Sequence, residues 1–273
     1  MLPGIDEKAW RKAKDTGGFM TRIKLCGLTR IQDIEIANKL KPEYIGFIFW
    51  DRSSRNVSAI QAARLKGKLD PEIKAVGVFV NAPAEQVISY YNVGIIDIAQ
   101  LHGNENEEYI KKLHDAGLTV IKAFKMKKTG ENINLAGNGN IETPEKPTGD
   151  VITEIPEKPT GNAITGIPEK PTGNAITETS EKSTDDVITE AVKSSADYIM
   201  FDPGKGEGAT FNWQPIKGIK REFFLAGGLT PENIEKAVET VQPFAVDVSS
   251  GIETNGHKDP DKMSAFVKST RAL

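Results

Sequence analysis

The chain has 273 residues, with 35 lysines and arginines against 38 aspartates and glutamates, and a formal net charge of −3. A charge so close to zero, without a basic cluster, argues against a nucleic-acid partner bound through phosphate neutralisation. The single cysteine cannot form an internal disulfide, and no Cys/His cluster accompanies it, so we expect neither a disulfide scaffold nor a metal site. No apolar run reaches membrane-spanning length, and residues 1–20 lack the apolar core of a signal peptide. We expect a soluble cytoplasmic protein without a membrane partner.

Eight short runs rich in β-branched and aromatic residues predict β-strands, each followed by a segment of helical period. The predicted strands are 22–25, 44–49, 75–80, 96–100, 119–124, 198–201, 223–226 and 244–248. The predicted helices are 31–40, 58–69, 83–91, 106–116, 186–195, 213–219, 231–241 and 259–270. Helix-start signals support three of them: Ser58, Thr230-Pro231 and Asp259-Pro260.

The strands are continuous apolar runs, which is typical of strands covered on both faces. Eight such strand–helix units in one chain predict an α/β fold, the closed (β/α)8 TIM barrel, with a doubly wound sheet as the alternative. Without the two extra segments described next, about 198 residues remain, which is close to the lower limit of about 200 for such a barrel.

A low-complexity insertion separates the fifth and sixth predicted strands. It contains a twelve-residue repeat, PEKPTGDVITEI, that recurs from Pro156 and Pro168 and in degenerate form from Ser180. Its composition is too polar to bury a core, and two prolines per repeat break helices. We expect a disordered surface insertion over residues 130–184, the alternatives being a partner-binding arm or a small β-solenoid. Residues 1–20 are an N-terminal extension, and residues 21–273 form the barrel domain.

Parallel barrels carry their chemistry at the carboxyl ends of the strands, which gives a short set of candidate residues. Cys26 ends the first strand and faces the pocket, where a lowered pKa would make it a thiolate able to accept a proton. Asp202 ends the sixth strand, and desolvation there would keep it protonated as a general acid. An inert buried thiol and a capping carboxylate are the structural alternatives.

Other strand ends supply binding groups. Arg55 follows the second strand and can pair with a carboxylate or phosphate, while Gln100 and His102 lie on one side of the fourth. Glycine-rich loops follow the last two strands, where barrels commonly hold a phosphate. The predicted phosphate-binding residues are Gly227, Gly228, Ser249, Ser250 and Gly251. An acid and a base around a bound sugar phosphate indicate a proton-transfer isomerisation.

Seven motifs of the sequence resemble the phosphoribosylanthranilate isomerase family of tryptophan biosynthesis. They are KLCGLT from Lys24, GFIFWDRSSRNVS from Gly46, VGVFVN from Val76, QLHG from Gln100, FDPGKGEGATFNW from Phe201, LAGGLTPENI from Leu225 and PFAVDVSSGIE from Pro243. The resemblance runs from about Thr21 to the C-terminus, interrupted by the repeats, and each motif lies at a predicted strand end.

The resemblance implies an Amadori rearrangement of N-(5-phosphoribosyl)anthranilate to 1-(2-carboxyphenylamino)-1-deoxyribulose 5-phosphate, the third step from chorismate to tryptophan. It makes Cys26 the general base and Asp202 the general acid, and places Arg55 near the anthranilate carboxylate. Gln100 and His102 would line the pocket, and the two glycine loops would hold the phosphate. No cofactor is implied, and the chain would act as a monomer or homodimer.

Two alternative functions stay open at this point. Another sugar-phosphate isomerase or epimerase would share the fold, but such enzymes often use paired carboxylates or a metal. A non-catalytic protein, with the barrel as scaffold and the repeats as the functional element, is the alternative from a different class.

Overall fold

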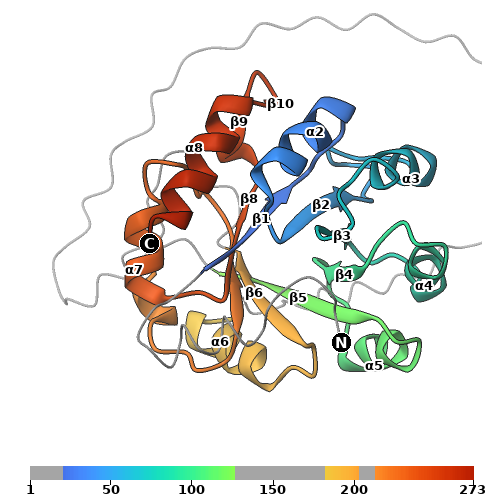
Figure 1. Ribbon diagram of the computed structural model, residues 1–273. Coiled ribbons are helices and arrows are strands. Elements are labelled where there is room, and N and C mark those ends of the chain that lie inside the picture. Colours follow the sequence, from blue (N-terminus) through green and yellow to red (C-terminus); the bar gives the residue numbers. More distant parts are fainter. Residues whose placement is uncertain (1–20, 127–181, 203–212) are drawn as a thin grey trace, which may run out of the picture. The chain divides into compact units, whose positions relative to one another are not determined.

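Eight strands close into a parallel barrel in which each strand pairs with the next along the chain and β8 returns to β1 (Figure 1). The computed structural model describes residues 21–126, 182–202 and 213–273. The strands are β1 (Arg22–Cys26), β2 (Tyr44–Ile48), β3 (Lys74–Phe79), β4 (Ile98–Leu101), β5 (Thr119–Lys125), β6 (Tyr198–Asp202), β7 (Phe223–Leu225) and β8 (Ala245–Val248). The predicted fold class is confirmed, since parallel strands in chain order are what strand–helix alternation produces.

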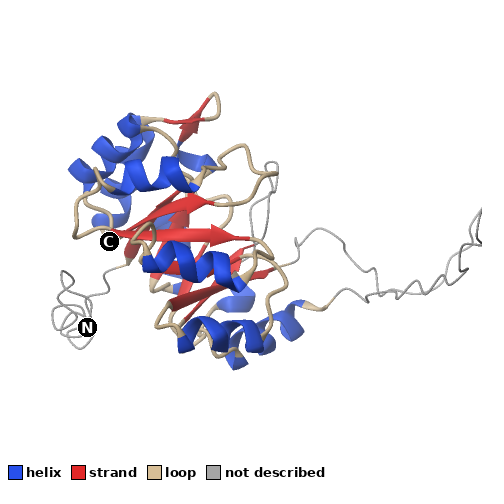
Figure 2. Cartoon of the chain, turned by 90° about the vertical axis from the view of Figure 1, so that its right-hand side faces the viewer, coloured by secondary structure: helices blue, strands red, loops and turns tan. Residues whose placement is uncertain are grey.

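Helices surround the barrel, so the strands lie in the middle of the molecule (Figures 1 and 2). They are α2 (Ile31–Leu40), α3 (Ala59–Lys66), α4 (Ala84–Asn92), α5 (Glu107–Asp115), α6 (Thr184–Lys193), α7 (Ile234–Val241) and α8 (Pro260–Arg271). Two short 3-10 helices, η1 (Gln214–Ile216) and η2 (Ser250–Ile252), and a hairpin of β9 (Glu253–Thr254) and β10 (His257–Lys258) complete the described elements. No helix in the described ranges is long and apolar enough to span a bilayer.

The apolar core has two parts, because successive side chains of a strand point to opposite faces. Ile23 and Leu25 of β1 belong to the larger cluster, which fills the space between strands and helices. A smaller cluster fills the barrel interior and includes Tyr44, Phe224 and Phe244. The ring centroids of Tyr44 and Phe224 lie 5.5 Å apart, and those of Phe224 and Phe244 lie 5.8 Å apart. The barrel interior is therefore a packed core and not an open channel.

Two of the predicted helix starts are confirmed. The Ser58 side chain accepts a hydrogen bond from the Gln61 N–H at the start of α3. Asp259 caps α8, accepting from the N–H groups of Asp261 and Lys262, with Pro260 as the first helical residue.

The prediction for Thr230-Pro231 was wrong. The Asn233 side chain accepts from the Thr230 N–H, and the Thr230 hydroxyl accepts from the Glu232 N–H, so a turn over these residues precedes α7. The helix begins only at Ile234.

The predicted helix 213–219 was also wrong. Only the 3-10 helix η1 forms there, with Pro215 in its first turn and Gly218 at φ 82° immediately after it. A proline and a left-handed glycine this close together leave no room for a regular α-helix.

The helix predicted at 186–195 begins two residues earlier than expected, inside the degenerate fourth repeat. Helix α6 starts at Thr184 within the degenerate fourth repeat, with Ser183 as its N-cap. The Ser183 hydroxyl accepts from the Asp186 N–H, and the Asp186 carboxylate accepts from the Ser183 N–H, which is a capping box. The predicted disorder of the other repeats concerns residues outside the described ranges, as does the extension 1–20.

Truncation of the barrel interior tests this account of the core. Phe224 is fully buried, so Phe224→Ala is expected to lower the free energy of unfolding by about 3–5 kcal/mol through lost burial and a residual cavity. Ile60→Ala is the control, because Ile60 is 70% exposed and its loss costs less than about 0.5 kcal/mol. Urea unfolding followed by circular dichroism measures both. Equal midpoints for the two variants would contradict the packed interior.

Candidate active site

The strands of a parallel closed barrel all end at the same mouth, and the predicted site residues gather there. Cys26 and Asp202 are the last residues of β1 and β6, and Gln100 lies in β4. The remaining predicted residues follow directly in the loops after β2, β4, β7 and β8: Arg55, His102, Gly227, Gly228, Ser249, Ser250 and Gly251. The structure thus brings all the candidate residues to one end of the barrel.

One side of this mouth is a chain of hydrogen bonds that ends on Asp202. The Gln100 side-chain nitrogen donates to Nδ1 of His102 at 3.1 Å and contacts the Met200 sulfur at 3.3 Å. With Nδ1 accepting, Nε2 of His102 carries the proton and faces Oδ2 of Asp202 at 3.0 Å. Gln100 is 1% exposed, and its side-chain oxygen has no hydrogen-bond partner among the described residues. The carboxyl of Asp202 is therefore held in a fixed orientation at the end of β6.

On another side of the mouth, Cys26 is almost completely covered, with 5% of the residue exposed. Burial raises the pKa of its thiol, the nearby charge of Asp247 raises it further, and Lys24 opposes the rise. The expectation of a lowered thiol pKa was wrong, because the end of β1 is desolvated and an acidic residue of β8 lies beside it. The Cys26 thiolate is consequently a stronger base than the thiolate of a solvent-exposed cysteine.

Arg55, in the loop after β2, was expected to be available for a substrate carboxylate or phosphate. In the structure it is already paired with a carboxylate of the chain. Its Nε and Nη2 donate to the two oxygens of Glu253, both at 2.6 Å, in a bidentate pair. Lys258 donates to the same carboxylate at 2.6 Å. Burial raises the pKa of Glu253, but the hydrogen bonds from Arg55 and Lys258 outweigh it and lower the pKa to about 2.

The sequence analysis missed Glu253 and Lys258 because it did not predict the hairpin that carries them. They pair across β9 and β10, and the intervening residues are Asn255 at φ 52° and Gly256 at φ 76°. Asn-Gly with both residues at positive φ is the strongest short-range signal for a two-residue hairpin. That dipeptide could have located the hairpin and its two charges.

The two glycine loops are packed against each other, as a common phosphate site requires. A Cβ atom on Gly251 would lie 1.9 Å from the Leu229 carbonyl oxygen, so only glycine fits there. Gly228 has φ 64°. Within the described chain, the N–H groups of Gly228, Ser250 and Gly251 donate to no acceptor. Among the described residues, these loops therefore present N–H donors at the mouth without a protein acceptor.

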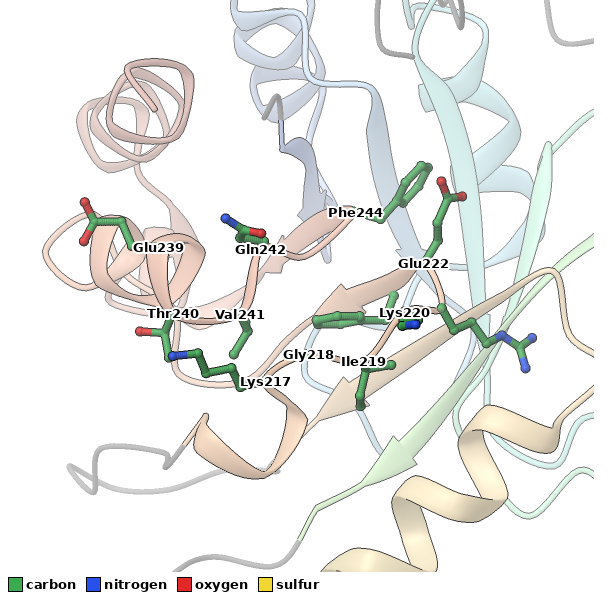
Figure 3. Close-up of a pocket in the computed structure, with 12 residues that line it drawn as sticks. Lys217, Gly218, Ile219, Lys220, Glu222, Glu239, Thr240, Val241, Gln242 and Phe244 are labelled. Carbon is green, nitrogen blue, oxygen red and sulfur yellow. The ribbon is translucent and has the colours of Figure 1, made fainter. Parts of the chain in front are cut away.

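The structure also has a pocket away from this mouth. A pocket lined by residues 217–223 and 239–242 with Phe244 lies at the amino ends of β7 and β8, which in barrels is the end that serves stability (Figure 3). In the described ranges, no group of three or more His, Cys, Asp or Glu residues is placed to hold a metal ion.

Fold and mouth together define the class of the protein, a (β/α)8 barrel with a carboxyl, a thiol and glycine-rich loops where such barrels place their active sites. A sequence profile described as N-(5'phosphoribosyl)anthranilate (PRA) isomerase matches residues 23–140 and 166–269. The chain therefore belongs to the PRA isomerase family. The break in the match, residues 141–165, contains the first twelve-residue repeat and most of the second.

Individual relatives agree with this assignment over nearly their whole length. The N-(5'-phosphoribosyl)anthranilate isomerase of Thermoanaerobacter sp. (strain X514) is 33% identical over 256 residues, covering 93% of this chain and 100% of the relative. The protein of the same name from Clostridium acetobutylicum is 36% identical, with 92% and 98% covered.

Solved structures show the same similarity. The phosphoribosyl anthranilate isomerase of Thermotoga maritima superposes with a TM-score of 0.67 at 27% identity, covering 93% of this chain and 100% of the other. A phosphoribosyl anthranilate isomerase in complex with reduced 1-(o-carboxyphenylamino)-1-deoxyribulose 5-phosphate gives 0.65 at 26% identity, with the same coverage.

The buried carboxylate of Glu253 predicts a specific pH dependence of stability. Its pKa is about 2 in the folded chain against an ordinary value of 4.5, so its stabilisation is fully present above pH 4.5 and disappears as the pH falls towards 2. Glu253→Gln is expected to cost about 2–3 kcal/mol at pH 7 and progressively less between pH 4.5 and 2. Urea unfolding of both proteins across this range measures the difference. A difference independent of pH would contradict the ion network.

Proposed function

We propose that the chain is an isomerase that converts N-(5-phosphoribosyl)anthranilate to 1-(2-carboxyphenylamino)-1-deoxyribulose 5-phosphate in tryptophan biosynthesis. The observation that carries the proposal is the convergence of Cys26 and an oriented Asp202 at one mouth of a PRA isomerase family barrel. Curated relatives with this activity in their names align with almost the whole chain. The relatives support the reaction, and the positions of Cys26 and Asp202 at the mouth support their roles in it.

Asp202 would act as the general acid on the furanose ring oxygen. Its Oδ2 lies 3.0 Å from Nε2 of His102, so the carboxyl that delivers the proton is held in place. As the ring C–O bond breaks, the lone pair of the anthranilate nitrogen forms the C1–N double bond, and the proton from Asp202 completes the released hydroxyl. The electrons come from the substrate itself, so the step needs no cofactor.

Cys26 would act as the general base in the next step. Its thiolate takes the proton from C2, the C–H electrons form the C1–C2 double bond, and the iminium nitrogen recovers its lone pair. The resulting enolamine tautomerises to the ketone. Since the pKa of the buried thiol is raised, the thiolate is a strong base for this carbon acid, and kcat/KM is expected to rise with pH as the thiol ionises.

The remaining candidate residues would position the substrate. Arg55 would bind the anthranilate carboxylate, which has the same chemistry as the Glu253 carboxylate that it contacts in this structure. The buried side-chain oxygen of Gln100 has no hydrogen-bond partner among the described residues and would accept from a substrate hydroxyl. The unpaired N–H groups of Gly228, Ser250 and Gly251 would bind the phosphate, supported by Gly227 and the Ser249 hydroxyl in the same loops.

We also propose the assembly and layout of the chain. The barrel comprises residues 21–273, and the extension 1–20 and the repeats up to Lys182 are dispensable additions to it. A solved relative is named a monomer generated from a dimeric enzyme of Thermotoga maritima, so both monomer and homodimer fit this family. A cytoplasmic location matches an enzyme of amino-acid synthesis with one buried free cysteine.

Substitution of the two proton-transfer groups tests the function. Cys26→Ala and Asp202→Asn are each expected to lower kcat at least about 100-fold, the usual scale for general acid–base groups. Asp115→Asn is the matched control, because its carboxylate is exposed on α5 and pairs with Lys111 of the same helix. Loss of the anthranilate fluorescence of the substrate reports turnover. Near-normal turnover in either site variant removes that residue from the mechanism, and an inactive wild-type chain refutes the function.

Deletion of the repeats tests the domain layout. Removal of residues 140–182 is expected to leave kcat/KM within a few-fold, since the barrel and its mouth are formed by other residues. Extending the deletion through Ser183 removes the N-cap of α6 and is expected to cost about 1 kcal/mol of stability. Activity and thermal unfolding measure the two effects. A soluble, folded deletion variant without activity would show that the repeats belong to the working site.

A further inference from the structure

Directly beneath Cys26, a lysine and an aspartate form a buried ion pair inside the barrel. Lys24 is fully buried, and its Nζ donates to Oδ1 of Asp247 at 2.9 Å. The two residues lie opposite each other in the register of β1 and β8. Burying an ammonium and a carboxylate is costly even when they pair, so a barrel interior that needed only apolar packing would not require them.

The same ammonium lies close to the Cys26 sulfur. Lys24 and Cys26 are two residues apart on β1 and point to the same side of the strand. Gly46 lies opposite Cys26 on the neighbouring strand β2. A Cβ atom there would be 2.6 Å from the Cys26 sulfur and 3.2 Å from the Lys24 Nζ. The missing side chain of Gly46 therefore provides the space that the thiol and the ammonium share.

We propose that Lys24 is a positioning residue of the candidate active site, with its buried ammonium, anchored by Asp247, stabilising the thiolate of Cys26. This inference rests on the proposed function, in which that thiolate removes the C2 proton. Lys24 does not need to touch substrate for this role. Its charge makes ionisation of a thiol in a desolvated position attainable, and Asp247 keeps the ammonium in place and limits its effect.

Four charged groups, from β1, β8, β10 and the loop after β2, act on the thiol. Lys24 and Lys258 favour the thiolate, and Asp247 opposes it, together with the burial that raises the thiol pKa. Arg55, in the loop after β2, also interacts with the thiolate. Lys258 and Arg55 are held by Glu253, while Lys24 is held by Asp247, so the ion pair beneath the thiol can be altered without touching the other network.

The single cysteine of the chain makes this proposal directly measurable. The pH dependence of thiolate absorbance near 240 nm reads Cys26 alone once the spectrum of Cys26→Ala is subtracted, and the pH dependence of iodoacetamide alkylation gives an independent midpoint. Lys24→Met is expected to raise the midpoint by about one pH unit or more, because the nearest cation is lost. Asp247→Asn is expected to lower it, because the opposing carboxylate is lost.

Opposite shifts from the two partners of one ion pair separate this role from a purely structural one. Loss of packing or stability would move both midpoints in the same direction or neither, and either result overturns the proposal. If Lys24→Met does not fold, Asp247→Asn decides alone, because the neutral amide removes the charge that opposes the thiolate, and the thiolate then pairs with the Lys24 ammonium. An unchanged or raised midpoint in that variant is then the contradicting result.

Kinetics connect the pair to catalysis. The pH at which kcat/KM is half-maximal is expected to move with the thiol midpoint, while KM for N-(5-phosphoribosyl)anthranilate stays within about threefold, since neither residue binds substrate. The thiol titration uses no substrate, so it distinguishes two failures. Opposite thiol shifts without matching kinetic shifts would leave the ion-pair effect in place and refute the role of Cys26 as base.

Discussion

Closure of eight parallel strands into one barrel is the constraint on which the other features of this chain depend. Closure pairs β8 with β1, and that pairing brings Asp247 next to Lys24 across 223 residues of sequence. Parallel direction puts every carboxyl end at the same mouth, so residues from β1, β4 and β6 meet there. Successive side chains of each strand point to opposite faces. One set therefore packs against the helices, and the other set fills the barrel interior.

The two proton-transfer candidates occupy different surroundings within that mouth. Cys26 is covered, and its surroundings are charged: Lys24 and Asp247 lie beneath it. Asp202 is held by a hydrogen-bonding chain that runs from Gln100 through His102. A base that must gain a proton from carbon and an acid that must deliver one to oxygen need such different environments, which a single barrel supplies by using different strands.

Much of this arrangement could be predicted from the sequence, because strand position and chemistry are both local properties. Each predicted strand was confirmed within about two residues, and the rule for barrel strand ends selected residues that do share one mouth. Partners could not be predicted in the same way. Glu253 and Lys24 meet Arg55 and Asp247 only when the barrel closes. The raised pKa of Cys26 comes from its burial and then from Asp247, a residue near the other end of the chain.

The most direct test of the account is a crystal structure of the full chain with reduced 1-(o-carboxyphenylamino)-1-deoxyribulose 5-phosphate. The account predicts the phosphate against the N–H groups of Gly228, Ser250 and Gly251, and the Cys26 sulfur about 3–3.5 Å from C2. It also predicts the ligand carboxylate on Arg55, with Glu253 displaced. A phosphate bound elsewhere, or C2 far from the Cys26 sulfur, would contradict the account.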